Sequence, residues 1–336
     1  MKALSLFSGA GGDTLGMELA GVSVVGFVEL DKVYSETHLE NFPNSIQIGN
    51  DITKIPDKDF LEYKDQIDIL FAGFPCQGFS KAGKKDPNDK RNNLFYEFVR
   101  VAKLVKPKWI IGENVKGILS MKFDNGDYVK DVIVNEFEKL GYSMAPPNVI
   151  KCKKFGIPQN RERCFFLGYL GEKNQFDFNL LQTQELLPIE PILEETLENA
   201  IEIKNTFEIP LFKEINDNIL IKGKPKLNLS KCLLENKLSF GKRASPVHGE
   251  IVDISKPVNT IICSYGRMPR FFVPLKNANG FYLRDFTVKE LQQIQGFPKD
   301  YIFKGDNIKK INQIGNAVPP PVVKEIIEII KSLNQT

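Results

Sequence analysis

A glycine-rich turn near the N-terminus constrains the fold of this chain more than any other feature. Residues 7–12 have the sequence Phe-Ser-Gly-Ala-Gly-Gly and follow a short apolar run, and Glu29 ends the next such run. Such a turn lets a ligand approach the backbone at the start of a helix, and a carboxylate at the second strand end can accept hydrogen bonds from ribose hydroxyls. Thr14 stands where the dinucleotide pattern has its third glycine. The pattern therefore favours a nucleoside cofactor without a pyrophosphate, although a plain tight turn would use the same residues.

The first half of the chain alternates short β-branched or aromatic runs with segments of helical period. This alternation is typical of a doubly wound α/β fold, in which helices cover a parallel sheet. Helical stripes are expected at Phe95, Phe98, Val99, Ala102 and Val105, and again at Val129, Val132, Ile133, Phe137 and Leu140, where Gly141 closes the helix. The expected strands are Ala3 to Phe7, Ser23 to Glu29, Ile67 to Ala72, Trp109 to Glu113 and Cys164 to Tyr169.

Composition excludes several classes of protein. The 336 residues include 45 basic and 42 acidic ones, so the net charge of +3 does not by itself indicate a nucleic acid partner. Nowhere does an apolar run approach the roughly 18 residues that span a bilayer, so we expect neither a membrane span nor secretion, and a cytoplasmic location. The five cysteines are odd in number and lack a C-x-x-C pair, and the only histidines are His38 and His248. We therefore expect no disulfide framework and no metal site.

Three groups of reactive side chains lie next to the ends of expected strands. Cys76 comes after the strand that ends at Ala72, Glu113 ends its own strand, and Arg161 and Arg163 stand at the start of another. Because α/β active sites lie beyond the carboxyl ends of strands, a thiol, a carboxyl and guanidinium groups would converge there. A single cysteine is more often inert core and an arginine pair an ordinary solvated face, so the prediction depends on their occurring together. Asp51 is either an adenine-binding carboxylate or a turn cap.

The α/β pattern weakens after about residue 171. We expect a catalytic and cofactor-binding domain at 1–170, a target recognition lobe at 171–283, and a segment at 284–336 whose amphipathic helix packs back on the first domain. The stretch 254–284 has no acidic residue and combines five positive charges with aromatic residues, which predicts a basic aromatic face or, alternatively, a fold-stabilising hairpin. Its candidates for DNA contact are Arg267 and Arg270.

Six motifs in order resemble those of the cytosine-C5 DNA methyltransferase family. They are the turn at 7–12, Pro75-Cys76-Gln77 followed by Phe79-Ser80, Glu113-Asn114-Val115, Gln159-x-Arg161-x-Arg163, the segment from Arg284 to Pro298, and Gly315-Asn316-Ala317-Val318-Pro319. The resemblance covers 1–170 and 284–336, and the segment between corresponds to the family's variable target recognition region. One difference is Leu291-Gln292, where members often have Ala-Arg; it removes no catalytic group.

The resemblance implies a DNA (cytosine-5)-methyltransferase that uses S-adenosylmethionine, releases S-adenosylhomocysteine and flips a cytosine out of double-stranded DNA. Cys76 would be the nucleophile, Glu113 the proton-sharing carboxyl and Arg163 the cation at the base carbonyl, with Arg161 helping to orient the base or a phosphate. The DNA-binding residues would be Gln77, Ser80, Arg267 and Arg270. The cofactor-binding residues would be Phe7, Gly9, Ala10, Gly11, Gly12, Glu29, Asp51, Ile52, Pro75, Asn316 and Ala317.

The size of the chain fits a monomeric modification enzyme that serves a restriction system without binding the endonuclease.

Two rival functions use the same scaffold. An RNA cytosine methyltransferase is disfavoured by the Pro75-Cys76-Gln77 form and the sizeable middle lobe, and a non-enzymatic DNA-binding relative by the retention of Cys76, Glu113 and the glycine turn. A dehydrogenase would leave the cysteine, carboxyl and arginine unexplained.

Overall fold

The structure of this protein is a computed structural model that describes residues 1–75, 93–123, 125–172, 176–204 and 208–334. The chain forms two compact units. The first unit comprises Met1–Phe155, Glu162–Thr183 and Ala317–Thr336, and the second comprises Gly156–Arg161 and Gln184–Asn316. The predicted domain boundaries at residues 170 and 284 separate parts of the chain by function and not by compactness, so they stay a prediction.

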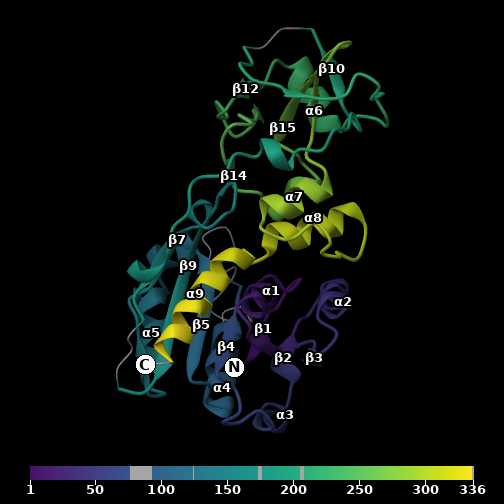
Figure 1. The fold of residues 1–336 in the computed structure, drawn as a ribbon. Coiled ribbons are helices and arrows are strands. Elements are labelled where there is room, and N and C mark those ends of the chain that lie inside the picture. The colour runs from purple at the N-terminus through teal and green to yellow at the C-terminus, as the bar shows by residue number, and fades with distance from the viewer. Residues whose placement is uncertain (76–92, 124, 173–175, 205–207, 335–336) are drawn as a thin grey trace. The chain divides into compact units, whose positions relative to one another are not determined.

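The first unit is built on an eight-stranded mixed sheet (Figure 1). Its order is β3-β2-β1-β4-β5-β9-β6, and β7 also pairs with β9. The five strands from β3 to β5 are parallel, and the order reverses between β1 and β4, so the expected doubly wound α/β class is confirmed. The strands are β1 Lys2–Leu6, β2 Ser23–Val28, β3 Ile46–Gly49, β4 Ile69–Ala72, β5 Trp109–Val115, β6 Tyr142–Met144, β7 Asn148–Lys151 and β9 Glu162–Leu170.

The parallel arrangement expected from the sequence holds from β1 to β5 but does not extend to β9. This strand runs antiparallel to β5, β6 and β7. The chain reaches it from β7 through residues 152–161, which include a 3-10 helix and β8. This connection is shorter than the dozen or more residues that a parallel crossover needs.

Helices of the first unit follow the predicted stripes closely. On α4, Phe95, Phe98 and Val101 are fully buried, and the expected stripe residue Val99 is partly buried against the same core, so the inner stripe is wider than expected by Val101. The last turn of α5 is followed by Gly141 at φ 89°, as expected for a helix-closing glycine. The helices are α1 Gly12–Leu19, α2 Lys32–Asn41, α3 Asp57–Leu61, α4 Asn93–Val105, α5 Val129–Glu138 and α9 Pro320–Leu333.

The C-terminal helix α9 packs against α1, the helix that follows the glycine-rich turn (Figure 1). A Cβ atom at Gly16 would lie 2.5 Å from the Pro320 carbonyl oxygen and 2.6 Å from the Val323 Cβ atom. Only glycine permits this approach of the two backbones. The C-terminal helix thus belongs to the first compact unit.

In its described residues, the second unit has a six-stranded sheet, a two-stranded pair and three α-helices. The larger sheet has the order β10-β16-β15-β13-β12, with β11 paired to β15, and β14 pairs with β8. The helices are α6 Leu227–Leu234, α7 Val288–Ile294 and α8 Asn307–Asn316. The strands are β8 Gln159–Asn160, β10 Ile201–Ile203, β11 Lys213–Glu214, β12 Leu238–Phe240, β13 Gly249–Ile251, β14 Val258–Asn259, β15 Phe271–Asn277 and β16 Gly280–Arg284.

The stretch 254–284 forms only in part the basic aromatic face that its composition predicted, because Arg267 and Phe281 are exposed whereas most of its aromatic residues are not. Tyr265, Phe272 and Tyr282 are buried, and β15 and β16 form an antiparallel hairpin, which was the alternative interpretation. Arg284 is fully buried and donates to both carboxylate oxygens of Glu290, at 2.6 and 2.8 Å. Most of these aromatic residues and Arg284 therefore stabilise the lobe. Net charge and hydropathy along a sequence do not distinguish a buried ion pair from a solvated one.

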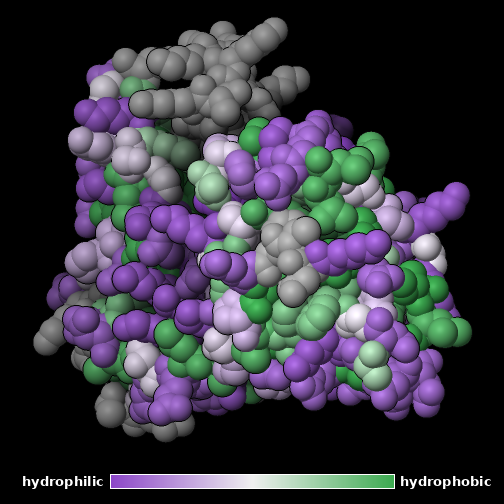
Figure 2. Space-filling model, turned by 90° about the horizontal axis from the view of Figure 1, so that it is seen from above, coloured by the Kyte–Doolittle hydropathy of each residue, from purple (hydrophilic) through white to green (hydrophobic). Residues whose placement is uncertain are grey.

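No helix in the described ranges is both long enough and apolar enough to cross a bilayer. On the face that Figure 2 shows, hydrophobic residues are scattered among hydrophilic ones.

Candidate active site

The glycine-rich turn joins β1 to α1 through left-handed backbone. Phe7, Gly9 and Gly11 have φ angles of 55°, 56° and 78°, which end the first strand one residue earlier than expected. A Cβ atom at Gly9 would have no described atom within 4 Å, so this part of the turn faces open space. The turn thus has the exposed backbone that a nucleoside ligand requires.

Glu29 supports this turn directly. One carboxylate oxygen accepts a hydrogen bond from the Gly9 N–H at 2.7 Å, and the other accepts from the Asp31 N–H at 2.8 Å. Burial raises the pKa of Glu29 above its ordinary value. The predicted contact with a ribose stays a prediction, but the carboxylate is beside the turn where that contact would require it.

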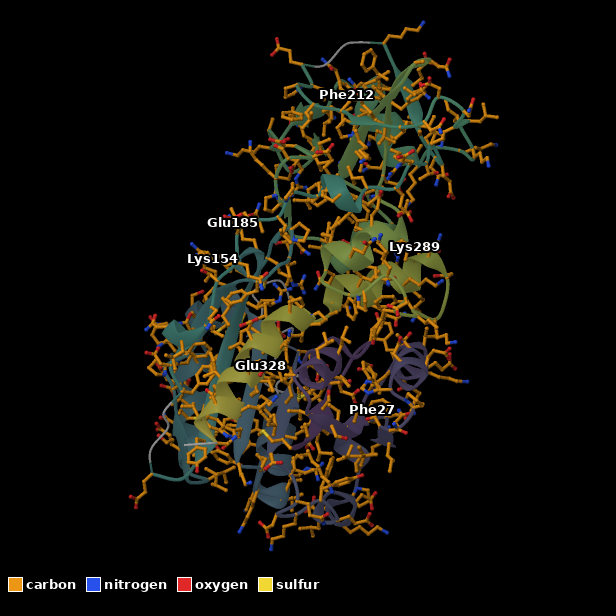
Figure 3. All side chains as sticks on the ribbon, in the orientation of Figure 1. Phe27, Lys154, Glu185, Phe212, Lys289 and Glu328 are labelled. Carbon is orange, nitrogen blue, oxygen red and sulfur yellow. The ribbon has the colours of Figure 1, made fainter. Side chains whose placement is uncertain are left out.

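The pair formed by Ser8 and His38 was not anticipated from the sequence. The Ser8 hydroxyl and His38 Nδ1 are 2.7 Å apart, and the imidazole stacks on Phe27 with ring centroids 3.8 Å apart. Phe27 is labelled in Figure 3. Burial lowers the pKa of His38 to about 3, so the ring is neutral near pH 7. His38, on α2, therefore holds the turn at Ser8, whereas Glu29 holds it at Gly9.

Asp13, in the first turn of α1, was also missed. Its side chain is buried and accepts a hydrogen bond from the Ser5 hydroxyl. Burial raises the pKa of Asp13 to about 7. The next residue, Thr14, has a buried hydroxyl without a hydrogen-bond partner among the described residues. The start of α1 is thus a polar site inside the first unit.

Four motifs meet at Gly73, directly after β4. A Cβ atom at Gly73 would lie 3.5 Å from Val318 Cγ2, 3.7 Å from Glu113 Oε2 and 3.9 Å from the Phe7 carbonyl oxygen. The glycine turn, the loop that leads to Cys76, the Glu113 triplet and the last motif therefore come together at one edge of the sheet. This is the convergence that parallel strand ends predicted.

Glu113 and Arg163 form an ion pair at this edge. Arg163 Nε lies 3.0 Å from Glu113 Oε1, and the two side chains are 15% and 10% exposed. They come from the adjacent strands β5 and β9, whose antiparallel register places Arg163 opposite Val115. A carboxyl and a guanidinium are thus held together beside the loop, with limited access to water.

Asn114 connects this pair to the loop that carries the cysteine. Its side-chain amide donates to the Phe74 carbonyl at 2.9 Å, and its side-chain oxygen accepts from the Val115 N–H at 2.8 Å. The backbone is therefore held two residues before Cys76, and the partly exposed Pro75 follows. Cys76, Gln77 and Ser80 lie outside the described residues.

Asp51 caps the short 3-10 helix Ile52–Lys54. It accepts from the Thr53 hydroxyl at 2.7 Å and lies 3.1 Å from Lys54 Nζ. The bond from Thr53 lowers the pKa of Asp51. Ile52 is buried. The geometry supplies the capping role that was the alternative for Asp51, and cofactor contact by Asp51 and Ile52 stays a prediction.

Arg161 has partners quite unlike those of Arg163. It is 1% exposed and donates to the carbonyls of Ile261 and Gly315 at 3.3 and 3.1 Å, within the second unit. Two predicted cofactor-binding residues follow Gly315. Asn316 is exposed at the end of α8 in the second unit, and Ala317 is buried in the first unit. Their roles, like the catalytic role given to Arg161, stay predictions.

The two candidate DNA-binding arginines differ in surroundings. Arg267 is exposed and directly follows the 3-10 helix η8 Cys263–Gly266. Arg270 is partly buried, and its guanidinium donates to the Val247 carbonyl at 2.8 Å. Arg267 is therefore the better placed of the two to contact a ligand.

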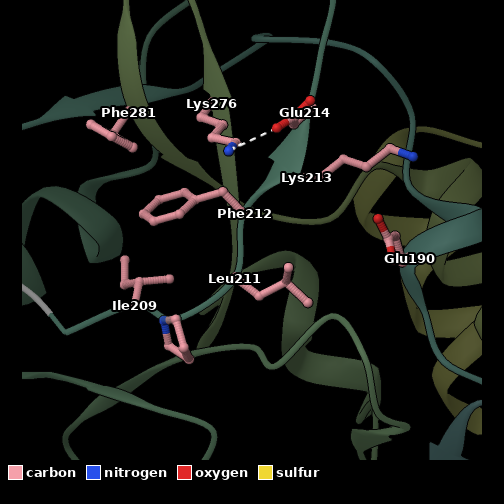
Figure 4. A pocket seen from close by; sticks show the side chains of 9 residues that line it. Glu190, Ile209, Leu211, Phe212, Lys213, Glu214, Lys276 and Phe281 are labelled. Carbon is pink, nitrogen blue, oxygen red and sulfur yellow. Dashed lines mark ion pairs between the residues drawn. The ribbon is translucent and has the colours of Figure 1, made fainter.

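A hollow of about 550 Å³ lies in the second unit, lined by Ile209, Phe212 and Phe281 and by charged side chains (Figure 4). Lys276 pairs with Glu214 at 2.8 Å, and Lys213 and Glu190 balance each other in charge. Because these charges balance, the hollow has no net positive charge that would favour a phosphate.

In the described part of the chain, no group of three or more His, Cys, Asp or Glu residues could hold a metal ion.

Comparison with known proteins decides the family. Residues 1–332 match the description of the C-5 cytosine-specific DNA methylases. The chain belongs to that family. This methylase is 32% identical to the Type II methyltransferase M.DdeI of Desulfomicrobium norvegicum, over 98% of this chain and 88% of the relative. It is also 32% identical to the Type II methyltransferase M.FnuDI of Fusobacterium nucleatum, over 98% of this chain and 94% of the relative.

Solved structures agree on the fold of the methylase. A prophage-encoded DNA modification methyltransferase from E. coli matches with a TM-score of 0.74 at 23% identity, over 100% of both chains. The Dnmt2 methyltransferase of S. pombe matches with a TM-score of 0.70 at 20% identity, over 99% of both chains. The family resemblance predicted from the motifs is confirmed, and the protein is a DNA (cytosine-5)-methyltransferase.

Proposed function

We propose that this methyltransferase uses S-adenosylmethionine, bound at the glycine-rich turn, to methylate a cytosine flipped out of double-stranded DNA. The observation that supports this most directly is the approach of Phe7, Glu113 and Val318 to Gly73, since it joins the turn to the catalytic motifs. The bound donor would supply an electrophilic methyl group on a sulfonium. The open backbone at Gly9 and the carboxylate of Glu29 fit a nucleoside of this kind.

In this proposal, Cys76 activates the base. Carbon 5 of cytosine is a poor nucleophile, so the Cys76 thiolate adds to carbon 6 and creates an electron-rich carbon 5. After the methyl group is attached, the proton on carbon 5 leaves and the thiolate is eliminated, which restores the ring. The Asn114 contact with the Phe74 carbonyl holds the backbone that carries this thiol.

Glu113 and Arg163 would stabilise the activated ring. A proton shared between the Glu113 carboxyl and ring N3 neutralises the negative charge that grows as the thiolate adds. Arg163 supplies a fixed cation for the carbonyl oxygen of the pyrimidine. Their ion pair, with 3.0 Å between Nε and Oε1, keeps both groups oriented before a base enters.

The second unit would contact the DNA around the target. Arg267 is exposed and suited to two hydrogen bonds with a guanine edge.

Because the relatives M.DdeI and M.FnuDI are Type II methyltransferases, we infer that this chain is the modification enzyme of a restriction system, working as a monomer and apart from its endonuclease.

The direct test is to incubate the protein with duplex DNA and labelled S-adenosylmethionine and to sequence the product for 5-methylcytosine. We expect methylation at one sequence context, and none with Cys76→Ser. Methylation of RNA but not of duplex DNA would overturn the proposed substrate, and label on a nitrogen of the base would overturn the proposed chemistry.

A further inference from the structure

Ile261 is held on both of its backbone groups by one short segment of the second unit. Its N–H donates to Gln159 Oε1 at 2.9 Å, and its carbonyl accepts from Arg161 Nη1 at 3.3 Å. Gln159 is fully buried, and its amide also donates to Gln295 Oε1 at 2.8 Å. Two motif residues therefore fix a residue about a hundred positions later in the chain.

Arg161 also fixes the end of α8. Its Nη2 donates to the Gly315 carbonyl at 3.1 Å. A Cβ atom at Gly315 would lie 2.5 Å from the Cys263 backbone nitrogen, so the two backbones are in direct contact. One guanidinium thus holds both Ile261 and the glycine that presses against Cys263. A planar fork with several donors can do this, whereas a lysine ammonium cannot reproduce the geometry.

The segment just after Ile261 alternates buried anchors with exposed side chains. Tyr265 is buried and its hydroxyl donates to the Phe271 carbonyl at 2.9 Å, while Gly266 lies against α8. The exposed residues are Ile262, Cys263, Ser264, Arg267 and Met268. We call residues 262–268 the presented loop. It offers a cation and apolar groups on a fixed backbone, which suits guanine edges and thymine methyl groups.

We propose that Gln159 and Arg161 are positioning residues for the presented loop, and that the loop determines sequence preference by contacting base edges of duplex DNA. This inference rests on the proposed function, because it takes duplex DNA as the substrate. It divides one motif between two tasks. Arg163 belongs to the chemistry, whereas Gln159 and Arg161 hold the loop that contacts DNA.

The test compares Arg161→Met with Arg267→Ala on a randomised duplex DNA pool. We expect Arg161→Met to weaken DNA binding about tenfold or more and to relax the same site positions as Arg267→Ala, since both disturb the same contacts. The loss of DNA affinity should exceed any loss of the single-turnover rate at saturating DNA, and the affinity for S-adenosylmethionine should stay within about twofold of wild type. Thr260→Val is the control, because it removes only the partly exposed bond to the Asn160 carbonyl at 2.8 Å and should change neither readout.

A second pair of variants keeps the test decisive if Arg161→Met fails to fold. Arg161→Lys keeps the charge and should show a smaller change of the same kind. Gln159→Glu keeps the acceptor for Ile261 but loses the donor to Gln295 Oε1, so it should show a larger change than Arg161→Lys. In the double variant Arg161→Met/Arg267→Ala, the two losses should be far from multiplicative.

Three results would overturn the inference. A fall in the single-turnover rate with unchanged DNA affinity and site preference would make Arg161 catalytic, and fully multiplicative losses would place its effect elsewhere. If Arg267→Ala and Met268→Ala leave affinity and preference unchanged while 5-methylcytosine still forms in duplex DNA, the loop does not contact DNA although the proposed function stands. Failure of the proposed function would show instead as absence of methylation in duplex DNA by the unaltered protein.

Discussion

The two units hold their functional residues in different ways. In the first unit, Glu113 and Arg163 lie on adjacent strands, and the carboxyl ends of parallel strands bring Phe7 and Gly73 beside them. In the second unit, the presented loop depends on side chains that bond to backbone far away in sequence, as Gln159 does with Ile261. The first arrangement follows from the fold class, whereas the second depends on individual side chains. We therefore expect substitutions at this sheet edge of the first unit to affect chemistry, and those at the anchors of the second unit to affect stability or DNA preference.

The largest effect is expected at Glu113. Glu113→Gln keeps the shape of the side chain but cannot donate a carboxyl proton, so the single-turnover rate should fall by about 10² to 10⁴. DNA affinity should change by less than about threefold, because the role concerns the reacting ring. A rapid-quench methylation assay measures the single-turnover rate, and a binding titration measures the DNA affinity.

The control for Glu113→Gln is Glu162→Gln. Glu162 lies next to Arg163 on β9 but pairs with Lys116 at the surface, at 2.9 Å. Its loss should leave the rate unchanged. Equal losses of rate and of DNA affinity in Glu113→Gln would make Glu113 structural.

In the second unit, Arg284→Met should destabilise the lobe by about 3 to 5 kcal/mol, because it leaves the buried Glu290 carboxylate without its cation. Chemical denaturation followed by far-UV circular dichroism measures the change in the free energy of unfolding. Lys256→Met is the matched control, since Lys256 pairs with Asp253 at 2.7 Å with its own side chain 72% exposed. A change as small as that of the control would show that the buried pair does not determine the stability of this lobe.

At the glycine turn, Glu29→Ala should weaken binding of S-adenosylmethionine by about 1.5 to 3 kcal/mol, the cost of losing charge-assisted hydrogen bonds. It removes both the proposed ribose contact and the observed bond from the Gly9 N–H. Calorimetry gives the affinity, with Glu36→Ala at the exposed face of α2 as control. Unchanged affinity would remove Glu29 from the cofactor site.

The smallest effect concerns the pH dependence of unfolding. The pKa of His38 is lowered to about 3, so the folded state binds fewer protons than the unfolded state, and His38 stabilises less as pH falls from about 6.5. The pKa of Asp13 is raised to about 7, so Asp13 acts oppositely and destabilises as pH rises through the range from 3.8 to about 7. Each contributes at most about 1.4 kcal/mol per pH unit.

Because these slopes oppose each other between about pH 4 and pH 6.5, single variants should separate them. Asp13→Asn should make the unfolding free energy rise more steeply with pH, and His38→Asn should make it rise less steeply. His38→Asn keeps a group near Nδ1 for Ser8, so its cofactor affinity should stay closer to wild type than that of His38→Phe. Parallel pH profiles for all of these proteins would contradict both assignments.

The sequence was enough to predict the sheet edge but not the contacts that stabilise it. The α/β pattern sets where parallel strands end, so it predicted that the glycine turn, Gly73 and Glu113 would meet at one edge. Arg163 stands at the amino end of its strand and reaches this edge only because β9 runs antiparallel to β5, which the sequence did not predict. The bonds of Asn114 to Phe74 and of His38 to Ser8 were missed, since any buried polar residue can find several backbone partners. In the second unit, charge along the chain predicted a basic face where Arg284 is buried, because its partner Glu290 belongs to the next helix.

The most direct test of the central claim is to trap the reaction with duplex DNA that has 5-fluorocytosine at the methylated position. Fluorine cannot leave as a proton does, so a thiolate attack at carbon 6 should give a complex that survives denaturation. We predict that peptide mapping places the adduct on Cys76, and that Cys76→Ser gives no adduct and no methylation while it binds S-adenosylmethionine normally. Efficient methylation of ordinary DNA without any such adduct, or an adduct on another cysteine, would contradict the account.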